Sequence, residues 1–197
     1  MTSMMNSALW VWLYTFAFAL LHSITAMNSL KYWFYRLGWS EHHYRLLYSV
    51  FGVVTTLLWL ALIRALPDVP LYHIQGLWQY MFYAIQGTGV LIALAALAPI
   101  DGAAFLGLKA FDSQGESFVV KGVYQYVRHP MYVGVILYLW FQPEQSVVSL
   151  NFAAAVSLYF IVGSRLEEKR MLKANPDYAD YQQQVGAFVP RFWSRSE

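Results

Sequence analysis

Three short polar segments stand out in the second half of an otherwise apolar chain of 197 residues. They read KGVYQYVRHPMYVG from residue 121, GSRLEEKRMLKANPDYADYQQQ from residue 163 and FVPRFW from residue 188. Each contains residue types that can hold a charged ligand, and each also has an explanation that involves no ligand. The chemistry of this chain, if it has any, is expected in these three segments.

In the first segment, Pro130 suits the opening position of a helix, because its missing N–H costs nothing there and its ring fixes a helical φ. Arg128 and His129 would then lie beside a helix amino terminus, where backbone N–H groups, the helix dipole and the arginine attract an anion. The alternative is interfacial anchoring, in which the arginine reaches lipid headgroups and the tyrosines form an aromatic belt.

The second segment places Glu167 and Glu168 near the end of an apolar helix that should continue to Asn175-Pro176. Neighbouring side chains on a helix point about 100° apart, so one carboxylate can face inward while the other meets water. Salt bridges at a solvated helix end would explain both glutamates. A carboxylate that faces a helix bundle at the membrane boundary, however, needs a partner, and a cationic ligand is a candidate.

Aromatic residues follow Pro176, namely Tyr178, Tyr181 and the rings of FVPRFW. They can anchor the chain at the membrane interface, or they can flank a cationic or planar ligand through cation–π and stacking contacts. Their spacing does not decide between the two.

The elements that position these segments are membrane helices, because the chain is 58% hydrophobic and only 12% charged. Continuous apolar stretches of about 20 residues predict helices rather than the alternating strands of a barrel. We predict an all-α, polytopic transmembrane bundle of about five helices with a carboxyl-terminal helical hairpin. The uncharged stretches cover residues 1–30, 46–63, 69–100, 130–143 and 145–164.

The fourth stretch has 14 residues, which span only about 21 Å as a helix. We expect it to pair with the fifth as a hairpin that turns at residues 142–146, where proline and small polar residues gather. The predicted organisation is a single membrane domain, 1–197. Residues 1–100 would hold three helices, 101–129 a cytoplasmic loop, 130–164 the hairpin and 165–197 a cytoplasmic, ligand-binding tail.

Loop charges predict the orientation. With the amino terminus outside, only Arg64 of the 13 lysines and arginines falls outside. The other twelve fall on the cytoplasmic side: Lys31, Arg36, Arg45, Lys109, Lys121, Arg128, Arg165, Lys169, Arg170, Lys173, Arg191 and Arg195. The first helix is not expected to be a cleaved signal, because it lacks a positive amino-terminal region.

The net charge of the chain is +2. Attraction of its basic residues to anionic lipid headgroups accounts for this excess, so no nucleic-acid partner is expected. The chain contains no cysteine, which excludes thiolate metal sites and cysteine nucleophiles, and no metal site is predicted.

The ordered set KGVYQYVRHPMYVG, RLEEKRML and PDYADYQQQV resembles the superfamily of membrane methyltransferases that includes isoprenylcysteine carboxyl and phospholipid methyltransferases. The resemblance implies S-adenosylmethionine as the methyl donor. It implies Arg128 and His129 as catalytic residues. The cofactor-binding residues that it implies are Tyr124, Arg128, His129, Pro130, Tyr132, Gly134, Glu167, Glu168, Tyr178 and Tyr181. A carboxylate and aromatic faces suit the donor's sulfonium and ammonium, and Arg128 suits its carboxylate.

The segments LLHSITA, YRLLYSVFGVV and APIDGAAFLGLKAF are similar to the branch of bacterial methanethiol S-methyltransferases and NnrU-like proteins. This resemblance implies a bacterial inner membrane and a small thiol acceptor, whose reactive thiolate Arg128 or a protonated His129 would favour. Other hydrophobic or lipophilic acceptors stay open: an isoprenylcysteine or lipid carboxylate and a phospholipid amine. A haem protein with His22 or His129 as an axial ligand, and a non-catalytic scaffold, are the alternatives of other classes.

Overall fold

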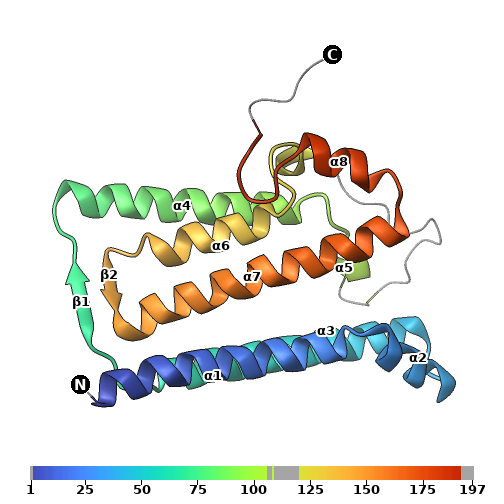
Figure 1. Ribbon diagram of the computed structural model, residues 1–197, viewed down its shortest axis with the longest axis horizontal. Coiled ribbons are helices and arrows are strands. Elements are labelled where there is room, and N and C mark those ends of the chain that lie inside the picture. The colour runs from blue at the N-terminus through green and yellow to red at the C-terminus, as the bar shows by residue number, and fades with distance from the viewer. Residues whose placement is uncertain (1, 106–107, 109–119, 192–197) are drawn as a thin grey trace. The chain divides into compact units, whose positions relative to one another are not determined.

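Helices dominate the computed structural model, which describes residues 2–105, 108 and 120–191. Two compact units emerge (Figure 1). The first contains the described residues of Met1–Leu71, Asp101–Asp112 and Ser146–Ala155, and the second those of Tyr72–Ile100, Ser113–Gln145 and Val156–Glu197. The long helix α7 (Val147–Ala174) has its first turns in the first unit and the rest in the second. The single domain predicted from sequence stays a prediction.

The first unit consists of α1 (Thr2–Thr25), α2 (Asn28–Arg36), α3 (Glu41–Arg64), the short α5 (Gly102–Phe105) and the start of α7. Aromatic stacking joins α1 to α3, since the rings of Phe18 and Trp59 lie 4.3 Å apart and nearly parallel. The start of α7 is held by Trp12, whose indole N–H donates to Asn151 at 3.0 Å. Ser40 caps α3 by accepting a hydrogen bond from the His43 N–H.

The second unit consists of α4 (Leu77–Leu97), the 3₁₀ turn η1 (Gly122–Gln125), α6 (Pro130–Trp140), the rest of α7 and α8 (Tyr178–Gln184). Helices α4 and α6 run side by side (Figure 1) and meet at two glycines. A Cβ on Gly89 would lie 2.6 Å from the Gly134 carbonyl oxygen, and a Cβ on Gly134 would clash with the Gly89 carbonyl. The absence of side chains therefore lets the two backbones touch, as small residues do between membrane helices.

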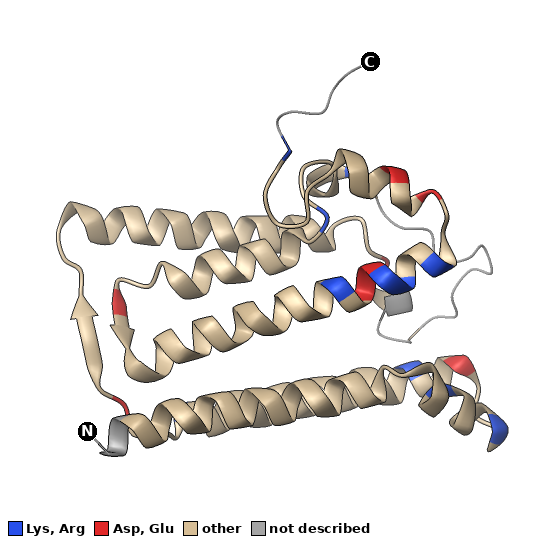
Figure 2. Cartoon of the chain, viewed as in Figure 1, with Lys and Arg blue, Asp and Glu red and all other residues tan. Residues whose placement is uncertain are grey.

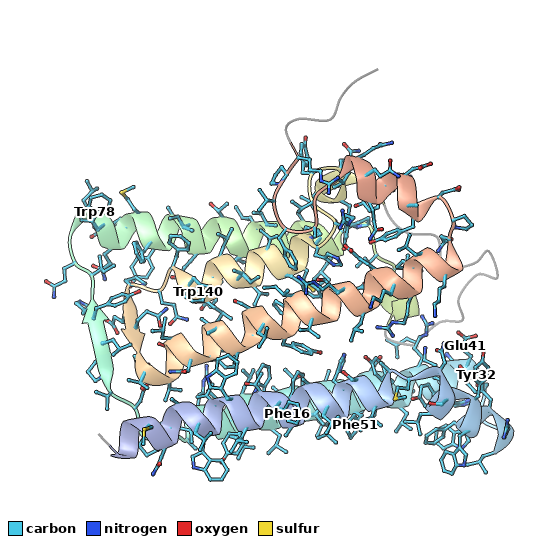
Figure 3. All side chains as sticks on the ribbon, in the orientation of Figure 1. Phe16, Tyr32, Glu41, Phe51, Trp78 and Trp140 are labelled. Carbon is cyan, nitrogen blue, oxygen red and sulfur yellow. The ribbon has the colours of Figure 1, made fainter. Side chains whose placement is uncertain are left out.

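The predicted helical bundle is confirmed. In the described residues, α1, α3, α4 and α7 are long and apolar enough to cross a membrane. The short fourth helix is also confirmed, because α6 has 11 residues, a rise of about 16 Å. Large apolar side chains project outward, as Phe16 on α1 and Trp78 on α4 do (Figure 3). Such exposure suits contact with lipid.

Two short strands correct the sequence-based boundaries. Residues 69–76 were expected to begin a helix and 142–146 to form a simple turn. Instead, β1 (Pro70–His73) pairs with β2 (Glu144–Ser146) in a two-stranded sheet. Pro70 disfavours a helical conformation in the residue before it, and Gly76 has a positive φ of 68° just before α4. Apolar composition alone does not reveal such a break.

Three of the described helices were missed by the prediction: the short α5, which lies in the predicted loop 101–129, α2 and α8. The first uncharged stretch ends as a helix at Thr25, and α2 follows as a separate helix whose mean hydropathy is far lower. Helix α8 begins at Tyr178, directly after the predicted end of α7 at Asn175-Pro176. The predicted continuation of α7 beyond Ser164 is confirmed, since the helix runs unbroken to Ala174.

Charged side chains gather toward one end of the helices in each unit taken separately (Figure 2). In the first unit this end carries α2 with Lys31 and Arg36. In the second it is the end of α7 that holds Arg165 and the glutamate pair, opposite Glu144. Lys109 and Arg195, which also entered the charge count, lie outside the described residues.

The contact between α4 and α6 predicts an asymmetric response to alanine substitution. Gly89→Ala should destabilise the protein by about 1–3 kcal/mol, because the new methyl group overlaps the α6 backbone. Gly87→Ala, two residues away on α4, is the matched control, since its Cβ would meet nothing within 4 Å. Thermal unfolding in detergent measures both, and equal melting temperatures for the two variants would contradict the packing described here.

Candidate functional site

The amino terminus of α6 is held by a segment from the end of the chain. Pro130 occupies the first turn of α6, as predicted. The Arg128 N–H donates to the Gly186 carbonyl at 2.8 Å, and the His129 N–H donates to the Ala187 carbonyl at 3.0 Å. Residues 127–129 and 186–187 therefore run alongside each other, and the polar triplet has a fixed backbone.

Glu168 is the centre of the polar contacts. Its Oε1 accepts hydrogen bonds from Arg128 Nε at 2.7 Å and His129 Nε2 at 2.9 Å, and its Oε2 accepts one from Gln182 at 2.8 Å. Only 13% of its side chain is exposed, and only 8% of the Arg128 side chain. The two buried charges compensate each other, as buried charges must. One carboxylate thus connects α7 with α8 and with the residues before α6.

The Arg128 guanidinium is largely engaged within the protein. Besides its bond to Glu168, its Nη1 donates to the carbonyl of Gln182 at 3.1 Å and to that of Val185. These carbonyls belong to α8 and the residue that follows it. Arg128 therefore fixes the carboxyl-terminal segment in place.

Glu167 has a different environment from its neighbour. Its side chain is 48% exposed. Its Oε2 accepts a hydrogen bond from the Tyr132 hydroxyl at 3.3 Å and lies 3.9 Å from His129 Nδ1. The expectation that one glutamate faces inward while the other meets water is confirmed: Glu168 is the inward one. Glu167 presents a carboxylate to the space beside Tyr132 and His129.

Four stacked rings form a feature that we call the aromatic column: Phe188, His129, Tyr132 and Phe160. The ring centroids lie 5.7 Å apart for Phe188 and His129, 5.3 Å for His129 and Tyr132, and 4.3 Å for Tyr132 and Phe160. The planes of His129 and Tyr132 differ by only 3°. The column extends from the end of the chain to the apolar part of α7, and it fixes the plane of the His129 ring.

The three other predicted tyrosines, Tyr124, Tyr178 and Tyr181, pack near one another. The Tyr181 hydroxyl donates to the Tyr124 carbonyl at 2.6 Å, and the Tyr124 hydroxyl donates to the Ala96 carbonyl at 3.2 Å. Tyr178 and Tyr181 are buried against Met171. Burial, and next the negative charge of Glu168, raises the pKa of Tyr178 to about 12. Burial likewise raises the pKa of Tyr181. Both phenols therefore stay protonated at neutral pH and hold α8 onto α7.

The structure brings most of the predicted site residues into one cluster, and their roles as ligands stay a prediction. Gly134 lies one turn into α6 and faces the α4 backbone. Gln182, Phe160 and Phe188 were missed as individual residues. Gln182 lies in the conspicuous polar run YQQQ, but the sequence does not tell which glutamine turns inward. The last two residues of FVPRFW lie outside the described residues.

The haem alternative named His22, a residue of the first unit. Its Nε2 lies 2.9 Å from the Tyr48 hydroxyl, and its ring stacks on Phe18 with centroids 5.9 Å apart. These contacts are those of a hydrogen-bonded packing residue.

Comparison with known proteins finds relatives that are named as methyltransferases. Residues 100–173 match the isoprenylcysteine carboxyl methyltransferase (ICMT) family. Methanethiol S-methyltransferase from Pseudomonas deceptionensis is 30% identical over 88% of this chain and 69% of its own length. Methanethiol S-methyltransferase 2 from Bradyrhizobium diazoefficiens is 29% identical over 90% and 71% of the two chains. The Crocosphaera subtropica enzyme of the same name is 29% identical over 91% and 73%.

No solved structure matches the chain significantly. The sequence relatives nevertheless cover nearly all of it, including the Arg128 and Glu168 segments, and α7, which carries Glu168, is long and apolar enough to cross a membrane. The chain therefore belongs to the family of membrane methyltransferases that contains the isoprenylcysteine carboxyl methyltransferases and the methanethiol S-methyltransferases.

Proposed function

We propose that this protein uses S-adenosylmethionine to methylate a small thiol such as methanethiol. The observation that carries the proposal is a half-exposed carboxylate, Glu167, beside a column of stacked rings at the charged end of α7. The names of the relatives from three bacteria support a thiol as the acceptor.

The residues present fit the cationic part of S-adenosylmethionine. Among the described residues, no arginine pairs with the Glu167 carboxylate, and Tyr132 and Phe160 offer aromatic faces. S-adenosylmethionine would supply an activated methyl group for direct transfer, so the protein needs no covalent intermediate. Arg128, by contrast, spends its Nε and Nη1 on protein acceptors. We therefore assign it to positioning Glu168 and the carboxyl-terminal segment.

The acceptor would approach from the hydrocarbon side. Helix α7 is unbroken from Val147 to Ala174. Phe160 lies on the uncharged part of this helix, and its ring stacks directly on that of Tyr132. A small apolar thiol can partition into lipid and reach the column from there. Alignment of the two reactants and exclusion of water are then the main contributions of the protein.

The membrane orientation belongs to the same proposal. The charged ends of the two units carry most of the lysines and arginines, which favours a cytoplasmic location for them. S-adenosylmethionine is a polar molecule and would reach Glu167 directly from the cytoplasm. The proposed location is a bacterial inner membrane, with the amino terminus outside and the carboxyl terminus in the cytoplasm.

Single cysteines test the orientation cleanly, because the chain contains no cysteine of its own. Asp180→Cys, on the exposed side of α8, should react with a membrane-impermeant thiol reagent only after the cells are lysed. Gln75→Cys, in the exposed segment before α4, should react in intact cells. Labelling of residue 180 in intact cells would contradict the proposed orientation.

Donor binding should depend on Glu167 in a specific way. Glu167→Gln should weaken S-adenosylmethionine binding at least tenfold, about 1.4 kcal/mol, because the cation loses its counter-charge. Titration calorimetry on the purified protein measures this effect. The control is Glu144→Gln, an exposed carboxylate that pairs with His73 and should bind the donor like the parent.

Glu168→Gln provides the contrast. It should lower the stability of the protein by ~3 kcal/mol, because Arg128 would stay buried without a compensating charge.

The Glu167 prediction would be contradicted by a Glu167→Gln variant that has a normal melting temperature and binds the donor as tightly as the parent. The donor site would then lie elsewhere.

The acceptor is identified by where a labelled methyl group goes. Purified protein incubated with methyl-labelled S-adenosylmethionine and methanethiol should release labelled dimethyl sulfide. Parallel incubations contain a prenylated cysteine or a phospholipid amine. Label only in the lipid extract would overturn the thiol assignment while the methyltransferase activity stands.

A further inference from the structure

We propose that neutral His129 takes the proton of the thiol acceptor through Nδ1, and that Glu168 and Gln182 position the ring for this task. The proposal rests on the proposed function, since it concerns the acceptor of the same reaction. The sequence-based expectation was that the charge of Arg128 or of a protonated His129 favours the thiolate. The hydrogen bond from the ring to Glu168 and the 3.9 Å gap between Nδ1 and Glu167 instead suit a ring that donates from Nε2 and can accept a proton at Nδ1.

The hydrogen bond between His129 and Glu168 selects the tautomer. Glu168 accepts three hydrogen bonds, from Arg128, His129 and Gln182, which is the arrangement of an ionised carboxylate. An ionised carboxylate can only accept, so the hydrogen of the 2.9 Å contact belongs to His129 Nε2. The Nδ1 atom of a neutral ring is then a proton acceptor.

Nδ1 faces Glu167, the carboxylate that we propose binds the methyl donor. It lies 3.9 Å from Glu167 Oε2, too far for a direct hydrogen bond. Two hydrogen-bond acceptors, His129 Nδ1 and Glu167 Oε2, thus border the same space. A thiol S–H in that space could donate its proton to either of them. Stacking against Tyr132 and Phe188 keeps the ring from rotating out of this arrangement.

The charged and titratable groups that contact His129 are few among the described residues. Glu167 and Glu168 face it from α7, and Tyr132 stacks on it from α6. The positive charge of Arg128 is compensated by Glu168 at 2.7 Å. Glu167 therefore gains a cationic neighbour when His129 takes up a proton, which stabilises the product side of the transfer.

The chemistry balances without a further reactant. The acceptor sulfur forms a bond to the methyl carbon while the bond from that carbon to the donor sulfur breaks, and its electron pair stays on the donor. The thiol proton moves to His129 Nδ1. From there it leaves to water past Glu167, whose side chain is half exposed. A methyl thioether, the demethylated donor and one proton result.

Gln182 is a positioning residue in this scheme. It contacts Glu168 Oε2 and so prevents the carboxylate from turning away from His129. Gln182→Met removes this hydrogen bond with little change in volume. Gln184→Met, an exposed position on the same helix, is the matched control. Gln182→Met should slow proton transfer, whereas Gln184→Met should behave like the parent.

Nuclear magnetic resonance of ¹⁵N-histidine tests the tautomer without any turnover. The chain has five histidines, so a variant with His22, His42, His43 and His73 replaced isolates the signal of His129. At neutral pH the ring should carry its proton on Nε2, with Nδ1 unprotonated. A ring protonated on Nδ1 alone, or on both nitrogens, would overturn the proposal.

The ionisation state of the thiol tests the role in catalysis. His129→Gln should slow methylation of an alkanethiol by ~100-fold or more, the usual contribution of a general base. Methylation of 4-nitrothiophenol, which is already ionised, should fall far less. Gln182→Met should shift the ratio of the two rates in the same direction. Equal loss with both thiols would overturn the base role and leave the proposed function intact.

Failure of the proposed function has its own signature. Methyl transfer to neither thiol by the parent protein would overturn that function, and the base role with it. The tautomer measured on the isolated His129 signal would then report on the geometry alone. The two results are therefore distinguishable.

Discussion

The buried ion pair between Arg128 and Glu168 is the interaction on which the rest of the site depends. Taking two charges out of water is costly, and their contact at 2.7 Å offsets that cost only because hydrogen bonds satisfy the remaining groups. His129 and Gln182 donate further hydrogen bonds to the Glu168 carboxylate. The Arg128 guanidinium donates to two carbonyls around the end of α8. Loss of either charge would leave the other buried without a compensating charge. This requirement ties the start of α6, the polar end of α7 and the carboxyl-terminal segment into one arrangement.

A second constraint sets where the start of α6 lies. Helix α6 is short, so its amino terminus is fixed by packing along α4 rather than by crossing the bilayer. Gly89 and Gly134 allow this packing, because a Cβ on either would collide with the other backbone. The assignment of Gly134 to the cofactor came from resemblance. Its surroundings show that it sets the position of α6, with Arg128 and His129 just before that helix, and its cofactor role stays a prediction.

How much the sequence predicts depends on how local the cause is. The helix start at Pro130 and the division between Glu167 and Glu168 follow from rules that operate within one or two turns, and both were predictable. Gln182 and Phe160 were not, because their importance arises from partners on other elements. The strands β1 and β2 were not predicted for a related reason. An apolar stretch indicates burial in lipid, but its breaks depend on which distant segment pairs with it.

The charges of the site also suit the proposed reaction as it proceeds. Arg128 and Glu168 cancel each other, so Glu167 leaves the cluster with one negative charge beside the aromatic column. S-adenosylmethionine carries a sulfonium, an ammonium and a carboxylate, a net charge of +1 that Glu167 would balance. Methyl transfer would remove the sulfonium charge, and an equal charge would arise on His129, 3.9 Å from the same carboxylate. The net charge that Glu167 balances would therefore be +1 before and after the transfer. Release of the proton to water would then remove that charge, which would weaken the binding of the demethylated donor and favour its departure.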